Sequence, residues 1–317
     1  MVKEWGSKTS ECWLCFDKVT GLVLDGSGLL NGNGGNWWPS VECSSRPVAV
    51  KFSGCEDITY NGLTQKDSPR SHISVFSSTN VTFSNIHLIA PENSPNTDGI
   101  DISLSHNIHI FSSSITTGDD CVAIKGGSYD INITDVACGP GHGISIGSLG
   151  KGGAIDTVQN VNVRHCSFKG TQNGARIKTW PGGRGFVKNI VYENITLINA
   201  QFPIIIDQQY SIGASYFNPT ATTNAVKVSD VTFKYFRGTC ADATAIKLDC
   251  DKNLRCGNIV MEHINITSSS PKTPLTVFCQ FADVISQFVS IDIKCGSHED
   301  PQAPSPAPIA PPPSLYI

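Results

Sequence analysis

The chain has 317 residues, of which 16% are charged, and a formal net charge of −4 at pH 7. An average soluble protein has roughly 25% charged residues. Here Gly, Asn, Ser, Thr, Val and Ile take that place, a composition typical of short strands and many turns. The negative charge argues against nucleic acid as a partner, and no apolar run is long enough to cross a membrane.

Twelve cysteines indicate an oxidising compartment, although their spacing leaves the pairing open. No arrangement of Cys and His predicts a zinc site. Four Asn-x-Thr sequons, which would also recur by chance at turns and strand edges, fit a secreted chain: Asn80, Asn132, Asn194 and Asn265. Residues 1–10 lack the apolar core of a signal peptide. We therefore expect a secreted chain that uses another route or lacks its true beginning.

A phrase recurs along the chain: Asn or Asp, then an alternating apolar segment, then polar turn residues. Most copies are about 23 to 30 residues apart, a spacing typical of solenoids, and they begin at Asp57, Asn80, Asn107, Asp130, Asn160, Asn189, Asp230 and Asn258. Period-two alternation indicates strands, and no helical segments separate them. The sequence therefore predicts an all-β protein with a single parallel β-helix, one coil per phrase. An antiparallel β-sandwich is the alternative.

The end of the chain has a different composition, with proline at many positions. Proline cannot donate to a sheet ladder, and such segments adopt extended conformations. We expect a β-helix domain over residues 1–297 and a proline-rich disordered tail over residues 298–317.

Three carboxylates occur in two turns about one repeat apart. Asp98 ends the sequence Asn-Thr-Asp, and Asp119 and Asp120 follow a glycine. If the coils stack in register, Asp98 lies on the rung beneath the other two. Neighbouring carboxylates cannot both ionise easily, so one is raised in pKa and can donate a proton while an ionised one activates water. Ordinary turns or a calcium site are the alternatives.

Further polar residues follow at similar intervals. His142 lies between two glycines about one coil later, where an imidazole can tune the acidity of a carboxyl group. Arg176 and Lys178 are two residues apart on an expected strand, so they share a face and can bind a carboxylate. Tyr210, one repeat further on, can reach the same groove. A loop histidine and a solvated strand face are the simpler interpretations.

The motifs Asn-Thr-Asp, Gly-Asp-Asp, Gly-His-Gly and Arg-Ile-Lys in this order, with the segment around Tyr210, resemble the polygalacturonases of glycoside hydrolase family 28. Similarity runs from about Trp13 to Cys295. The resemblance implies a right-handed parallel β-helix that hydrolyses α-1,4-linked galacturonan with inversion and needs no metal or other cofactor. Family members begin with a signal peptide and a further coil, so we expect this chain to lack its N-terminal coil.

The resemblance also implies roles for individual residues. Asp119 matches the general acid, while Asp98 and Asp120 match the carboxylates that hold and deprotonate the attacking water. His142 would tune the acid. The expected substrate-binding residues are Arg176, Lys178 and Tyr210. The family pattern implies three disulfides: Cys121–Cys138, Cys250–Cys256 and Cys279–Cys295.

We therefore expect a monomeric, secreted enzyme of the plant cell wall whose partner is pectic polysaccharide. Endo-type attack is favoured over exo-type attack, but the sequence does not decide between them. Two other hypotheses remain open at this point. One is an inactive, truncated, pectin-binding β-solenoid, and the other is a lyase that would need calcium and a base.

Overall fold

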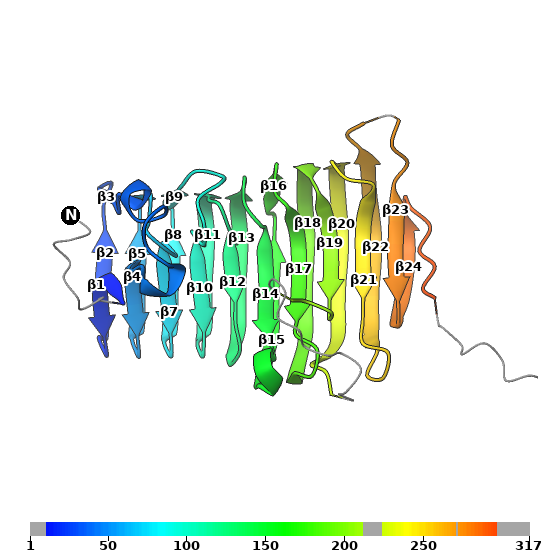
Figure 1. The fold of residues 1–317 in the computed structure, drawn as a ribbon, viewed down its shortest axis with the longest axis horizontal. Helices are drawn as coiled ribbons and strands as arrows, with labels where there is room; N and C mark the ends of the chain where they lie inside the picture. The colour runs from blue at the N-terminus through cyan, green and yellow to red at the C-terminus, as the bar shows by residue number, and fades with distance from the viewer. Residues whose placement is uncertain (1–10, 212–223, 271, 297–317) are drawn as a thin grey trace, which may run out of the picture.

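The computed structural model describes residues 11–211, 224–270 and 272–296. They form a right-handed parallel β-helix in which strands run across the long axis and successive coils stack along it, from β1 at one end to β24 at the other (Figure 1). The predicted all-β parallel β-helix is confirmed. The expected tail over residues 298–317 lies outside the described residues.

One sheet contains ten parallel strands and forms one long wall of the helix. In spatial order its strands are β1 (Cys12–Asp17), β4 (Val48–Ser53), β7 (Ile73–Phe76), β10 (Ile100–Ser103), β12 (Val122–Ile124), β14 (Ile144–Leu149), β17 (Asn173–Thr179), β19 (Phe202–Asp207), β21 (Thr244–Asp249) and β23 (Thr276–Gln280).

The second sheet contains fourteen strands. Its main path is β2 (Val23–Asp25), β5 (Glu56–Asn61), β8 (Thr79–Ser84), β11 (His106–Thr116), β13 (Ser128–Cys138), β15 (Ile155–Arg164), β18 (Arg184–Ala200), β20 (Lys227–Cys240), β22 (Cys256–Ser268) and β24 (Ala282–Val289). The short strands beside this path are β3 (Leu29–Asn31), β6 (Thr64–Lys66), β9 (His87–Ile89) and β16 (Ser167–Lys169). The described residues also include three 3₁₀ turns: η2 (Gly34–Asn36), η3 (Cys43–Ser45) and η4 (Lys151–Gly153). Among the described residues no helix could cross a bilayer.

The core consists of inward side chains that stack in register from coil to coil. In the ten-stranded sheet Ile73 pairs with Ile100, Ile100 with Val122, and Val122 with Ile144. All four are fully buried. Full burial of such a side chain contributes about 1.5–3 kcal/mol. Because the same row continues through other coils, the stacking fixes the register of each strand.

The backbone explains why each phrase begins with Asn or Asp. All eight first residues adopt left-handed conformations with φ between 52° and 57°, which these two residues tolerate better than other non-glycine residues. Their side chains also form a ladder outside the core. Asn80 Nδ2 donates to Asp57 Oδ1 (3.0 Å), and Asn107 Nδ2 donates to Asn80 Oδ1 (2.6 Å). The repeated polar residue is therefore a corner of the coil.

Four disulfides join cysteines that are close in sequence. The three pairs implied by the family pattern are confirmed: Cys121–Cys138, Cys250–Cys256 and Cys279–Cys295. Cys12 and Cys15 form a fourth bridge that the sequence did not predict. The remaining four cysteines are unpaired. Cys55, Cys166 and Cys240 are buried, and Cys43 is half-buried.

The corner conformation can be tested at Asn107. Asn107→Ala is expected to lower the melting temperature, because it removes the ladder hydrogen bond and forces alanine into a left-handed conformation that costs about 1–2 kcal/mol. Asn107→Gly removes the same hydrogen bond without that backbone penalty, so it should melt above the alanine variant. Thermal unfolding followed by circular dichroism gives the comparison, and equal melting temperatures would contradict this account.

Candidate active site

Outward positions of the ten-stranded sheet lie in register from coil to coil, and two of those near the acids carry polar side chains. Ala123, Ser145 and Arg176 are consecutive partners on β12, β14 and β17, one rung of about 4.8 Å apart. Asp98 and Asp120 each lie two residues before a strand, and those strands begin at register partners, Ile100 and Val122. The structure therefore places Asp98 one rung from Asp120.

Tight backbone contacts fix the turns that carry the acids. Thr97 Oγ1 accepts a hydrogen bond from the Gly118 amide at 3.0 Å and so ties the turn of Asp98 to the turn of Asp119. Gly143, directly after His142, has φ +83°, and a Cβ there would lie 2.2 Å from the carbonyl oxygen of Asn173. No other residue fits that position without moving the backbone, which explains the glycine beside the histidine.

Asp119 reaches into the groove, half-buried, beside His142. Its Oδ1 lies 2.9 Å from His142 Nδ1 and accepts a hydrogen bond from the Asp120 amide at 2.8 Å. Since Oδ1 already accepts from the backbone, we assign the proton of the His142 contact to Nδ1. Oδ2 of Asp119 makes no hydrogen bond within the described residues. A proton on this carboxyl group would therefore be carried by Oδ2.

Asp120 is the buried anion of the site, with 2% of the residue exposed. Lys178 Nζ donates to its Oδ2 and Ser145 Oγ to its Oδ1, both at 2.8 Å, and Arg176 Nη2 also donates to Oδ1. Burial alone would raise the pKa of this carboxyl group, but the charges of Arg176 and Lys178 outweigh it and hold the pKa below its usual range. Asp120 is thus a permanent negative charge.

Asp98 has the opposite electrostatic environment. Burial, followed by the charges of Asp101, Asp119 and Asp120, raises its pKa well above the usual range, and Lys125 offsets only part of this. Lys125 Nζ is 2.8 Å from Asp101 Oδ1, so its charge is mainly engaged there. The three acids therefore differ: Asp98 favours its neutral form and Asp120 its ionised form.

Arg176 and Lys178 project from β17 on one face, while Ile177 between them is fully buried in the core. The sequence predicted this alternation. It did not predict that both cations would be more than nine-tenths buried, at 8% and 7% exposure, against an acid of the same chain. Each keeps donors for a ligand: within the described residues Arg176 Nη1 makes no hydrogen bond, and the ammonium of Lys178 uses one of its three.

Tyr210 lies beside these cations in the groove. Its ring is 5.4 Å from Lys178 Nζ and meets the ring of Trp180 edge-on at 5.5 Å. A hollow of about 570 Å³ is bordered by Asp119, His142, Arg176, Lys178 and Tyr210, together with residues of β19 and β21. Except for the buried Asp120 and the half-buried Asp98, all sequence-predicted site residues thus border one cavity.

The donor atoms of Asp119, Asp120 and His142 lie within 4.8 Å of one another, so these residues are the nearest approach to a metal site among the described residues. Asp120 already accepts from two cations and a hydroxyl group. A divalent ion would be repelled by Arg176 and Lys178. The arrangement is therefore better suited to acid–base chemistry than to metal binding.

Sequence reasoning missed three residues that shape the site: Ser145, Asp101 and Lys125. Ser145 interrupts the apolar residues of β14 at an outward position, and it accepts from Arg176 Nε at 2.9 Å while donating to Asp120. This single polar residue between two isoleucines was the sequence feature that could have identified Ser145 as a site residue. Asp101 and Lys125 carried none, because their effect on Asp98 depends on contacts between coils.

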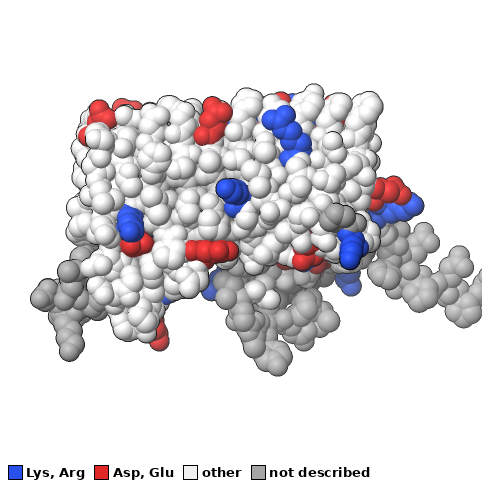
Figure 2. Space-filling model, turned by 90° about the horizontal axis from the view of Figure 1, so that it is seen from above, with Lys and Arg blue, Asp and Glu red and all other residues white. Residues whose placement is uncertain are grey.

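The charges on one face of the molecule are sparse. Figure 2 shows a face on which lysines, arginines and acidic residues are few and intermixed, without a large patch of one sign. Attraction for a polyanion must therefore come from individual cations in the groove rather than from the overall field.

The sequence profile of the glycosyl hydrolases family 28 matches residues 1–284. The chain is 46% identical over 258 residues to a "Probable polygalacturonase" of Arabidopsis thaliana, covering 81% of this chain and 56% of that protein. It is 42% identical over 273 residues to polygalacturonase-2 of Solanum lycopersicum, covering 84% and 59%. The chain thus spans less than two thirds of the length of these relatives.

Solved structures share the fold. The endo-xylogalacturonan hydrolase of Aspergillus tubingensis aligns with a TM-score of 0.75 and 27% identity over 92% of this chain and 82% of that chain. The polygalacturonase of Erwinia carotovora aligns with a TM-score of 0.73 and 26% identity over 86% and 72%.

The raised pKa of Asp98 predicts that this residue, although needed by the site, lowers the stability of the fold at neutral pH. A carboxyl group whose folded-state pKa is raised lowers the stability of the fold as pH rises above about 3.9, the unfolded-state value. Asp98→Asn removes this penalty, so its melting temperature should exceed that of the parent at pH 7. The advantage should shrink as pH falls towards about 4 and be lost below it, where Asp98 is protonated in both the folded and the unfolded state. Thermal unfolding at several pH values measures it, and a constant difference between the two proteins would contradict it.

Proposed function

The chain belongs to the glycosyl hydrolases of family 28, and from this premise we propose that it hydrolyses α-1,4-galacturonosidic linkages in pectic polygalacturonan. The observation that carries the proposal is the clustering of three carboxyl groups in two adjacent turns, with Asp119 bordering the groove, Asp98 raised in pKa and Asp120 lowered in pKa. Glycoside hydrolysis needs a carboxyl group that donates a proton and a carboxylate that activates water. The names of the plant relatives support the same substrate.

Asp119 is the proposed general acid. Its Oδ1 is held by His142 and by the backbone, which leaves Oδ2 to present a proton to the oxygen of the sugar linkage. As the bond from the anomeric carbon to that oxygen breaks, the proton passes to the leaving sugar. His142 orients the carboxyl group through this contact.

Asp98 and Asp120 are proposed to act on the attacking water in different ways. The raised pKa of Asp98 makes its carboxylate the stronger base, so Asp98 takes the proton as the water oxygen bonds to the anomeric carbon. The lowered pKa of Asp120 makes it a weak base, suited to holding the water and stabilising positive charge on the sugar ring. The reactive form has Asp98 ionised and Asp119 protonated.

Arg176, Lys178 and Tyr210 are the proposed binding residues for a galacturonate unit. The free donors of the two cations point to a carboxylate ligand, and the tyrosine ring lies beside the lysine ammonium. A neutral sugar would leave these donors without a charged partner.

We further propose endo-type attack with inversion, by a secreted monomer of the plant cell wall that needs no cofactor. Endo attack is supported by polar side chains that continue along the sheet on both sides of the acids. The four disulfides favour an oxidising compartment.

Incubation with polygalacturonate tests this function. The parent is expected to release reducing ends, and Asp119→Asn to reduce the rate by about 10²- to 10⁴-fold, since it removes the proton donor. Asp283→Asn, at a carboxylate whose side chain is 63% exposed, is the matched control and should retain parental activity. Proton NMR of the first product should show the inverted anomer.

Other outcomes would separate the alternatives. Retention of polygalacturonate without turnover by the parent would contradict hydrolysis and support a binding protein. A fall in viscosity no faster than the release of reducing ends would favour exo-type attack. An unsaturated product absorbing in the ultraviolet would support a lyase.

A further inference from the structure

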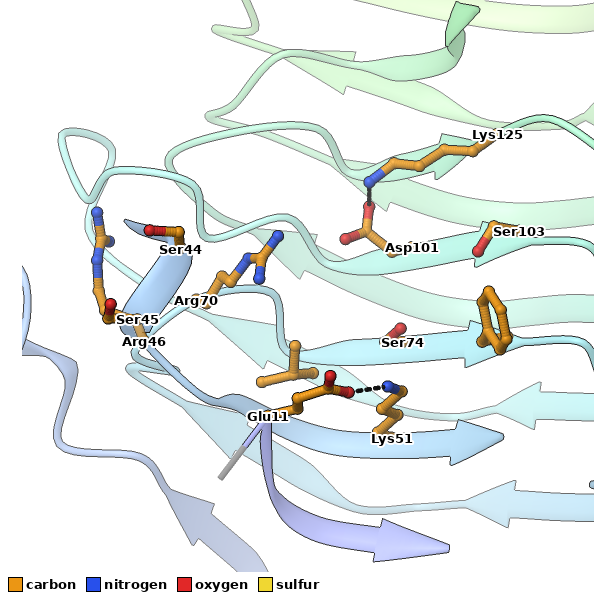
Figure 3. Close-up of a pocket in the computed structure, with 12 residues that line it drawn as sticks. Glu11, Ser44, Ser45, Arg46, Lys51, Arg70, Ser74, Asp101, Ser103 and Lys125 are labelled. Carbon is orange, nitrogen blue, oxygen red and sulfur yellow. Dashed lines mark hydrogen bonds and ion pairs between the residues drawn. The ribbon is translucent and has the colours of Figure 1, made fainter. Parts of the chain in front are cut away.

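A second hollow lies in the same sheet face, on the N-terminal side of the acids. It has a volume of about 330 Å³ and is bordered by residues of β4, β7, β10 and η3 (Figure 3). We call it the Arg70 pocket. Its charged lining residues are Glu11, Arg46, Lys51, Arg70, Asp101 and Lys125. Four cations and two carboxylates leave two positive charges in excess, in a chain whose net charge is −4.

Two of these cations already have partners. Lys51 Nζ lies 2.5 Å from Glu11, and Lys125 Nζ lies 2.8 Å from Asp101. Arg70 is half-buried and makes no hydrogen bond or ion pair within the described residues. Figure 3 shows its guanidinium group extending into the hollow between the two ion pairs, joined to neither. The pocket thus holds a cation with five free donors.

The backbone that carries Arg70 is fixed by a buried arginine. Arg46 is 6% exposed, and its Nη1 donates to the carbonyl oxygens of Pro69 (3.3 Å) and Pro95 (2.7 Å). These prolines directly precede Arg70 and Asn96, where the turn of Asp98 begins. Arg46 therefore ties the pocket to the catalytic turn, so the position of Arg70 relative to the acids is set by the fold.

Register gives the separation between the two basic positions. Arg70 lies three residues before Ile73 of β7, and β7 is four strands from β17, which carries Arg176. Four rungs of about 4.8 Å correspond to about 19 Å along the groove. The acids lie between these positions. One extended sugar chain can therefore contact both, on opposite sides of the bond that is cleaved.

We propose that the Arg70 pocket binds a second uronate carboxylate of the same polysaccharide chain. This rests on the proposed function and extends it to a substrate that must be several sugars long. A guanidinium group binds a carboxylate with two parallel hydrogen bonds. The rest of the lining suits a sugar ring: Ser74 and Ser103 offer hydroxyl groups, and Phe76, 40% exposed, offers an apolar face.

Binding without turnover tests the pocket. In the Asp119→Asn background, a galacturonate hexamer is titrated by calorimetry into the protein with Arg70 intact and into the Arg70→Gln variant. Removal of a charged hydrogen-bonding group should weaken hexamer binding by about tenfold or more. Arg70→Lys should recover part of the affinity. Arg237→Gln, at an exposed arginine on β20 in the other sheet, is the matched control and should leave affinity unchanged.

The nature of the ligand group is tested with a hexamer whose carboxylates are methyl-esterified. Its affinity should be the same with and without Arg70, because no charge remains for the guanidinium group to bind. If Arg70→Gln and its parent bind the hexamer with equal affinity, the proposed carboxylate binding in the Arg70 pocket is wrong and the proposed function stays intact. An equal loss for the esterified hexamer would also overturn the proposed carboxylate binding. No hexamer binding by the parent would remove the proposed function and this inference with it.

Discussion

The register of coil stacking is the constraint on which the rest of the structure depends. Each coil buries apolar residues against its neighbours, so a slip of one residue would turn every inward side chain of a strand outward. On β17 such a slip would expose Ile177 and place the charges of Arg176 and Lys178 in the apolar core, at a large desolvation cost. The core therefore holds the charged side chains at fixed places along the groove.

The two cations of β17 counter the repulsion between the neighbouring carboxylates. Three acids in one place repel one another, so that once one has ionised the pKa values of the others rise. Arg176 and Lys178 both bind Asp120, which makes that acid a fixed anion. Its charge in turn adds to burial in raising the pKa of Asp98. One pair of cations thus produces two carboxylates with opposite preferences: Asp120 stays ionised and is a weak base, whereas Asp98 is the stronger base.

The sequence was sufficient for the features that repeat and insufficient for those that depend on contacts between coils. The Asn and Asp corners and the alternating strands predicted the β-helix, and the spacing of Asp98 from Asp120 predicted that they would lie one rung apart. The partnership of Arg176 and Lys178 with Asp120 was not predictable, since it spans more than 50 residues and depends on side-chain reach. Nor could the sequence predict the effect of Asp101 on Asp98, or the unpartnered state of Arg70.

The basic residues of the groove differ in whether the protein itself supplies a carboxylate partner for them. At the acids the two cations share one internal carboxylate, Asp120, which offsets part of their attraction for a carboxylate of the substrate. Arg70 makes no hydrogen bond or ion pair within the described residues, although its charge helps to lower the pKa of Glu11, so its donors are available to a ligand. A contact at Arg70 would hold the substrate far from the cleaved bond, while the interactions at the acids strengthen as charge develops there. Binding energy from remote sugars then lowers the barrier rather than stabilising the bound ground state.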